Sequence, residues 1–182
     1  MAGIGGSLGD LTVEIIPGGG RDEPLPEVLK RASEALERGQ LDEAKRLCLE
    51  AVGRHGEHPL LLRLLGLVAH RNGELEAAIG WLESAVRHEG APPDCRNQLA
   101  QLYRLSGRFD EAMATARTAL ASMPRSPGPS CVLAQTCIDR GAFDEATEWL
   151  LRAITIDPEA AAAHLELGQL LLLRGEFRAG WL

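Results

Sequence analysis

The chain has 182 residues, of which 45% are hydrophobic and 25% are charged, a length that suits one domain or one short repeat array. Only 4% of the residues are aromatic, so a core built on large rings is excluded and the packing must come from Leu, Ala, Ile and Val. The formal net charge of -7 opposes broad binding to nucleic acid or to an anionic membrane. We therefore expect neither as a partner.

The cysteines and the first residues indicate a cytoplasmic protein. Cys48, Cys95, Cys131 and Cys137 form no C-x-x-C pair, and their spacing matches no zinc site, so we expect reduced thiols and neither a metal nor a cofactor. Residues 1–10 contain no basic residue and no sustained apolar run, unlike a signal peptide. No apolar stretch reaches the length of a membrane span.

Residues 1–24 are expected to form a glycine-rich tail, because they hold seven of the 20 glycines. Inside this tail, residues 11–16 contain Val, Thr and Ile, which favour a short extended strand. The glycines at positions 3, 5, 6 and 9 neither follow a strand nor open a helix, so they do not predict a dinucleotide-binding loop.

A repeat with a period of 34 residues begins after this tail. Five glycines mark it at equal spacing: Gly39, Gly73, Gly107, Gly141 and Gly175. A short segment with acidic residues and a final alanine, such as residues 40–44, follows each of the first four glycines. The period divides the chain into repeats at residues 25–58, 59–92, 93–126 and 127–160 and a partial repeat at 161–182.

The second repeat illustrates the structure that each unit predicts. Leu62, Leu65 and Ala69 recur at three- and four-residue steps and give a first helix with one apolar face. Gly73 supplies the left-handed backbone that ends this helix, and the apolar residues between 75 and 86 give a second helix. Because two antiparallel helices cannot bury both faces alone, neighbouring pairs must stack. The sequence thus predicts an all-α, right-handed solenoid of antiparallel helix pairs.

A leucine followed by a small residue stands in the middle of most first helices. The pairs are Leu65-Gly66, Leu99-Ala100, Leu133-Ala134 and Leu167-Gly168, with Tyr103 three residues after the second pair. With the 34-residue period, these residues resemble the tetratricopeptide repeat (TPR) family over about residues 25–182. The resemblance implies that the first helices line a concave face, which binds an extended peptide or a partner protein.

Residues that lie off the packing face of the first helices are the candidates for contact with this partner. Gln101, Gln135 and Gln169 form a ladder of identical amides, and an amide can both donate to and accept from a peptide backbone. Three arginines in the set could hold an acidic group by forked hydrogen bonds. Polar positions that are merely solvated would show the same period, so both interpretations stay open. The full set is Arg63, Leu67, His70, Arg71, Asn97, Gln98, Gln101, Arg104, Cys131, Gln135, Glu166 and Gln169.

The partial last repeat contains a leucine-rich helix. Leucines nearly encircle it, whereas a terminal repeat normally turns a polar face outward. One hypothesis is therefore a self-associating scaffold, a homo-oligomer formed through Leu167, Leu170, Leu171, Leu173 and Trp181. Residues 175–181 also resemble a segment of bacterial tetratricopeptide proteins that continue into glycosyltransferase-like domains. That likeness gives a second hypothesis, the substrate-recruiting N-terminal region of a larger enzyme.

No catalytic motif supports an enzyme within these residues. The sequence lacks H-E-x-x-H and Walker segments. The acidic pairs Asp42-Glu43, Asp110-Glu111 and Asp144-Glu145 recur at the starts of second helices, where negative charge interacts favourably with the helix dipole. We therefore predict a protein–protein interaction module that is not an enzyme.

Overall fold

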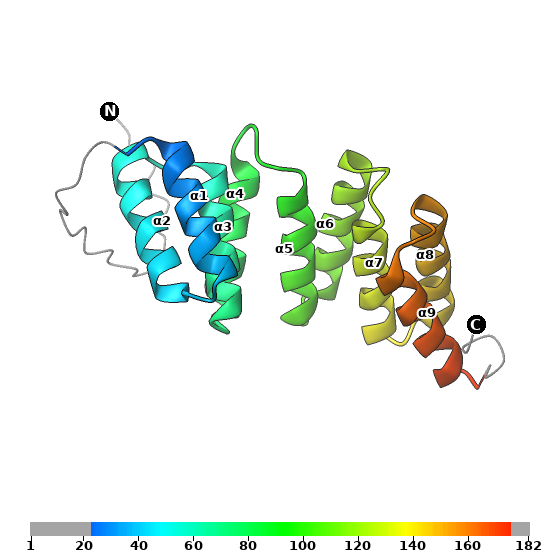
Figure 1. The fold of residues 1–182 in the computed structure, drawn as a ribbon. Coiled ribbons are helices and arrows are strands. Elements are labelled where there is room, and N and C mark those ends of the chain that lie inside the picture. Colours follow the sequence, from blue (N-terminus) through cyan, green and yellow to red (C-terminus); the bar gives the residue numbers. More distant parts are fainter. Residues whose placement is uncertain (1–22, 176–182) are drawn as a thin grey trace, which may run out of the picture.

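The computed structural model describes residues 23–175, and between these limits it contains nine α-helices and no strand. Their bounds are α1 Leu25–Glu37, α2 Leu41–His55, α3 Pro59–Arg71, α4 Leu75–Arg87, α5 Asp94–Leu105, α6 Phe109–Ser122, α7 Gly128–Asp139, α8 Phe143–Ile156 and α9 Ala161–Leu173. The helix pairs follow one another in chain order from α1 and α2 to α7 and α8, and α9 comes last (Figure 1). The predicted all-α solenoid of antiparallel helix pairs is confirmed. The predicted strand at residues 11–16 and Trp181 lie outside the described residues.

The turn inside each helix pair falls on the predicted glycine. The backbone φ angle is 75° at Gly39, 79° at Gly73, 78° at Gly107 and 76° at Gly141, a left-handed region that side chains disfavour. At Gly73 the turn closes with two backbone bonds: Gly73 N–H donates to His70 at 3.0 Å and Glu74 N–H to Ala69 at 2.9 Å. These bonds satisfy carbonyls at the end of α3 and reverse the chain into α4.

Each pair packs through the small residue in the middle of its first helix. A Cβ atom placed on Gly66 would lie 2.9 Å from Cγ of Leu82, so the missing side chain lets α3 and α4 approach closely. The same repeat position holds Ala32, Ala100 and Ala134, and each of these is completely buried. The helix pair therefore closes around this position in every complete repeat.

The core runs along the array as successive clusters of buried residues instead of one central core. One cluster joins α1, α2 and α3, a second spans α3 to α6, and a third reaches from α5 to α9. Trp81 packs against both the first and the second cluster and thus links neighbouring repeats. This arrangement is what stacked repeats produce, because each unit buries its apolar faces only against its neighbours.

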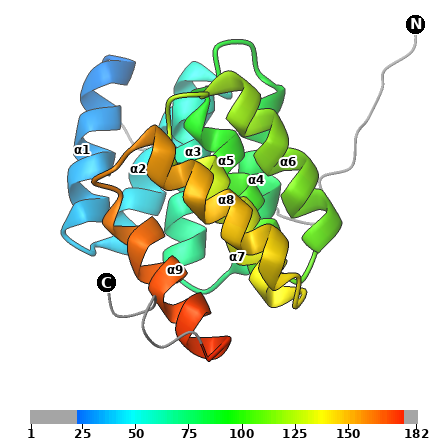
Figure 2. The same ribbon diagram turned by 90° about the vertical axis from the view of Figure 1, so that its right-hand side faces the viewer.

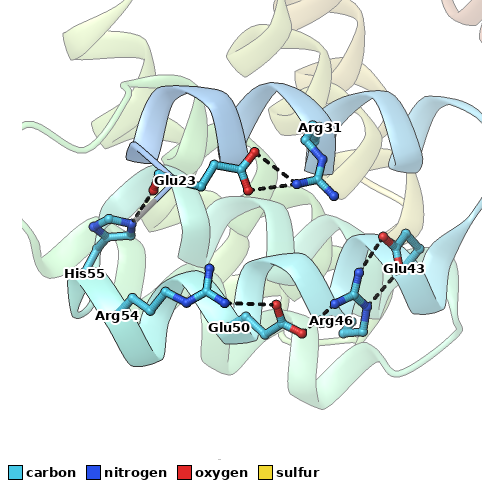
Figure 3. A network of polar contacts seen from close by, with 7 residues as sticks. All are labelled: Glu23, Arg31, Glu43, Arg46, Glu50, Arg54 and His55. Atoms are coloured by element: carbon cyan, nitrogen blue, oxygen red, sulfur yellow. Dashed lines mark hydrogen bonds and ion pairs between the residues drawn. The ribbon is translucent and has the colours of Figure 1, made fainter. Parts of the chain in front are cut away.

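A network of charged side chains covers the first helix pair (Figure 3). Arg31 donates to the carboxylate of Glu23 at 2.8 Å, and the ring of His55 lies 3.2 Å from the backbone carbonyl of Glu23. These contacts connect the start of α1 with the end of α2. Arg46 bridges Glu43 and Glu50, and its guanidinium holds the pKa of the Glu43 carboxyl below the ordinary value. The first repeat therefore presents charged groups to water.

Candidate functional site

The first helices of the repeats form a connected layer. Helix α1 packs against α3, and α5 packs against α7, whereas no two second helices make comparable contact in the part of the chain that the structure describes. Seen from the C-terminal end, α9 lies nearest the viewer together with α8 (Figure 2). We call the outer side of α1, α3, α5, α7 and α9 the first-helix face. All twelve residues predicted to contact a partner lie on these helices.

In the N-terminal half of the first-helix face, both arginines are already paired with groups of the chain itself. Arg63 Nε donates to Gln98 Oε1 at 3.3 Å, and its Nη2 lies 3.7 Å from Asp94 Oδ2. Gln98 Nε2 in turn donates to Asp94 Oδ2 at 2.8 Å, which closes the set. Arg71 Nη1 donates to the backbone carbonyl of Leu36 at 2.5 Å. Both guanidinium groups are therefore engaged with the chain itself, not held free for an acidic partner.

The C-terminal half of the face also carries contacts between consecutive first helices. Arg104 Nη1 donates to Asp139 Oδ2 at 2.7 Å, and only 17% of the Arg104 side chain is exposed. Gln135 Nε2 donates to Glu166 Oε1, which joins α7 to α9. Neither contact uses all the hydrogen-bonding groups of its partners.

Unpaired buried polar atoms concentrate on this face. Five side-chain nitrogen or oxygen atoms within residues 23–175 are buried without a hydrogen-bond partner, and four of them belong to predicted site residues. The four are Asn97 Oδ1, Arg104 Nε, Gln135 Oε1 and Glu166 Oε2. Leaving such an atom unpaired costs about 1–3 kcal/mol, and native structures contain few of them. All four atoms belong to residues on the first helices α5, α7 and α9.

Three of these atoms belong to residues around a single hollow, which we call the C-terminal hollow. It has a volume of about 250 Å³ and lies between the ends of α5, α7 and α9. Burial raises the pKa of the Glu166 carboxyl above its ordinary value, although the bond from Gln135 and the charge of Arg104 oppose this effect. The lining residues are Arg104, Gln135, Ile138, Asp139, Glu166, Gln169, Leu170 and Leu173.

The remaining predicted residues differ in their availability. Gln101 and Gln169 are exposed, and neither side chain forms a hydrogen bond with any residue from 23 to 175. His70 is exposed at the end of α3, and Leu67 is half-buried. Cys131 is half-buried, and burial raises the pKa of its thiol to about 11. This thiol is therefore protonated near neutral pH and is a poor nucleophile.

The sequence pattern did not single out Asp94 and Asp139, the carboxylates that pair with Arg63 and Arg104. A usable signal was present in the spacing. Arg63 and Gln98, Arg71 and Leu36, and Arg104 and Asp139 are all 35 residues apart, which is one repeat plus one residue. In this array, such a separation places two residues opposite each other on consecutive first helices.

Neither a metal site nor a membrane span is found in the described part of the chain. No group of three or more His, Cys, Asp or Glu side chains is placed to hold an ion there. None of the helices between residues 23 and 175 has the length and apolar character needed to cross a bilayer.

Comparison with known families identifies the repeat. A tetratricopeptide repeat model matches residues 29–94, and a second model of the same repeat matches residues 134–175. A model of anaphase-promoting complex, cyclosome, subunit 3 matches residues 71–153, between and overlapping the other two. These two segments contain tetratricopeptide repeats. The tetratricopeptide fold is typical of protein–protein interaction modules.

Solved structures share the fold of this tetratricopeptide array. MamA from Desulfovibrio magneticus RS-1 aligns with a TM-score of 0.73 at 15% identity, over 85% of this chain and 88% of that one. PilF from Pseudomonas aeruginosa aligns with a TM-score of 0.76 at 16% identity, over 85% and 71%. A tetratricopeptide repeat protein from Parabacteroides merdae gives 0.70 at 20% identity, over 85% and 62%. No curated protein matches the chain.

The glycosyltransferase and self-association hypotheses from the C-terminal sequence have less support than the repeat fold. None of the matching family models describes a glycosyltransferase, and that resemblance rested on a segment that lies almost entirely outside the described residues. For self-association, Leu173 is 75% exposed and Leu167 and Leu171 are half-buried. Leu170 is only 1% exposed, because it packs into the third core cluster, so this residue is not part of an accessible surface. Self-association stays a prediction.

Proposed function

We propose that the tetratricopeptide array binds an extended segment of a partner protein on the first-helix face, which the sequence predicts to be concave. One observation carries this proposal: Gln101, Gln135 and Gln169 occupy equivalent places on α5, α7 and α9, and the first and last of them are exposed with unused amides. An amide offers two donors and an acceptor, so it can pair with both the N–H and the C=O of a peptide. Affinity then depends little on the side chains of the partner.

The three amides contribute unequally. Gln101 and Gln169 can offer all their donors and acceptors, whereas Gln135 has already given an N–H to Glu166 and keeps its Oε1. The middle position of the ladder therefore offers one remaining N–H and its buried Oε1, and the outer positions offer both N–H groups and the oxygen. The proposed mechanism is hydrogen bonding on a preformed surface without covalent chemistry. Because the first helices are already packed, little ordering of the array is needed on binding.

The test is the triple substitution of Gln101, Gln135 and Gln169 by Ala. Peptides are selected from a random display library on the wild-type protein, and their affinities for both proteins are measured by calorimetry. Each lost bond to an uncharged group is expected to cost about 1 kcal/mol, so the triple variant should bind roughly 100-fold more weakly.

The control variant carries Thr118→Ala and Thr155→Ala. These exposed residues lie on the second helices α6 and α8, and their hydroxyls bond only to carbonyls of their own helices. This variant should retain wild-type affinity, and circular dichroism should give the same helicity for all three proteins. Selected peptides that bind the triple variant as tightly as the wild type would contradict the proposed function.

A further inference from the structure

The geometry points to the C-terminal hollow as an anchor for one basic side chain, arginine or lysine, of the bound segment. This inference rests on the proposed function and adds to it a specific chemical requirement on the partner. It follows from the charge around the hollow, from the unpaired atoms beneath it and from its apolar walls.

The charges around the hollow do not balance. Arg104, Asp139 and Glu166 are its charged lining residues, and the first two form an ion pair at 2.7 Å. Glu166 forms no ion pair with any residue between 23 and 175, and its only direct polar partner there is the neutral amide of Gln135. A half-buried carboxylate thus lacks a counterion. A cation from the partner would supply one, and the net charge of -7 on the chain favours its approach.

The unpaired atoms require hydrogen-bond donors. Gln135 Oε1 and Glu166 Oε2 are both acceptors, and both belong to side chains that already bond to each other. A guanidinium or an ammonium group carries several N–H donors and no acceptor, so it can serve both oxygens at once. Both oxygens are buried, so the cation reaches them only when the Glu166 carboxylate rotates about its terminal bond, which is a soft torsion. A carboxylate or phosphate ligand would instead add further acceptors beside these two.

The walls of the hollow suit the aliphatic stem of such a side chain. Ile138, Leu170 and Leu173 provide an apolar lining beside the polar groups. Long basic side chains bury their methylene stems against apolar surface while the charged head reaches polar partners. Leu173 is 75% exposed and would be partly covered by that stem. The third unpaired atom, Arg104 Nε, is a donor and can bond to a backbone carbonyl of the same segment.

The anchor would set the register of the partner on the amide ladder. The repeat position of Glu166 is occupied by Leu64 in α3, Gln98 in α5 and Val132 in α7. A carboxylate therefore occurs at this position only on α9 among these four helices. Equivalent amides alone would let a segment slide by one repeat, whereas a single charged anchor fixes one position.

The inference is tested with four short peptides by nuclear magnetic resonance. The first is the acetylated and amidated peptide Gly-Ser-Arg-Ser-Gly, and the others replace Arg by Lys, by citrulline or by norleucine. The arginine or the lysine peptide should shift the side-chain amide signals of Gln135 and Gln169. Citrulline keeps the shape of arginine, but a carbonyl oxygen replaces one of its NH2 groups and the charge is lost, so it should bind at least about tenfold more weakly, as should norleucine. The tighter of the two basic peptides identifies the preferred cation.

Two protein variants complete the test. Glu166→Gln keeps the size of the side chain and can still accept from Gln135, but it removes the charge, so affinity for the basic peptide should fall by about tenfold. Glu148→Gln makes the same change at an exposed position on the second helix α8 and should leave affinity unchanged.

Three outcomes would overturn the anchor. The first is the absence of a signal shift at about 10 mM basic peptide, a concentration that corresponds to a binding free energy near 3 kcal/mol on the 1 M scale. The others are equal binding of the citrulline and arginine peptides, and equal affinity of Glu166→Gln and the wild type for the basic peptide. If a peptide selected from the display library depends on the three glutamines but binds the wild type and Glu166→Gln equally tightly, the anchor is overturned and the proposed function stands.

Discussion

The two halves of the first-helix face differ in how completely the polar side chains of consecutive first helices pair with one another. Between α3 and α5, Gln98 accepts a hydrogen bond from Arg63 and donates another to Asp94. Between α7 and α9, the same repeat position holds Glu166, which accepts from Gln135 and has nothing to donate when ionised. The amide can therefore link a donor to an acceptor, whereas the carboxylate ends the chain of bonds. Glutamate in place of glutamine at this repeat position removes a donor, and Gln135 Oε1 and Glu166 Oε2 are left unpaired.

The difference teaches where binding is favoured on a repeated surface. Polar groups that satisfy one another within the protein gain little from a partner, because a new bond must replace an existing one. Unpaired buried atoms lose nothing when a partner arrives. The C-terminal half is therefore the better place for a specific contact, although both halves share the same backbone.

The largest expected effect tests whether both halves are equally well packed. Leu102 in α5 and Leu170 in α9 stand at the same repeat position and are 3% and 1% exposed. Replacement of either leucine by Ala should lower the free energy of unfolding by about 2–5 kcal/mol, measured by urea denaturation. Leu173→Ala, at a site that is 75% exposed, serves as the control and should change it by less than about 0.5 kcal/mol. An effect of Leu170→Ala as small as that of the control would mean that the hollow has no packed floor.

A smaller effect is expected from the arginines that bridge first helices in each half. Arg104 is 17% exposed and lies 2.7 Å from Asp139, whereas Arg63 is 31% exposed and lies 3.7 Å from Asp94. Arg104→Met should therefore lower the free energy of unfolding by about 1 kcal/mol and Arg63→Met by less than about 0.5 kcal/mol. Thermal and denaturant unfolding of both variants in low and in 1 M salt measures the difference. The reverse order would show that the ion pair near the hollow is not the stronger one.

The smallest effect is a change in the pH dependence of stability at Glu166. Its native pKa lies above the ordinary value of 4.5, because burial disfavours the charged form, so the native state binds this proton more tightly than the unfolded chain does. The free energy of unfolding should then fall as the pH rises from 4.5 through the native pKa of this group. Glu166→Gln removes this contribution.

The pH experiment compares the two proteins directly. Carboxyls with lowered native pKa, such as those of Glu43 and Glu111, change stability in the opposite sense and are present in both proteins. The measured quantity is therefore the difference between the unfolding free energies of Glu166→Gln and the wild type. This difference should increase in favour of the variant as the pH rises from 4.5 through the native pKa of Glu166. A difference that stays constant across this range would contradict the burial of an uncompensated carboxylate.

Much of the fold and part of the candidate site could be predicted from local patterns. The glycine period places the turns, because a left-handed backbone favours glycine wherever it occurs, and the small residue in each first helix marks its contact with the second. The same period located Gln101, Gln135 and Gln169 on consecutive first helices. These features depend on contacts within one helix pair or on the repeat period, so they can be recognised in the sequence without the tertiary structure.

The sequence by itself thus determined an array of helix pairs with a repeated polar face. Only the tertiary structure decided which polar groups on that face are already paired and that Gln135 Oε1 and Glu166 Oε2 have no partner. It also decided that Leu170 is buried while Leu173 is exposed. The physical reason is that these properties depend on the distance and rotation between neighbouring first helices. Small differences in both accumulate along stacked repeats, and they decide whether two side chains 31 or 35 residues apart can meet.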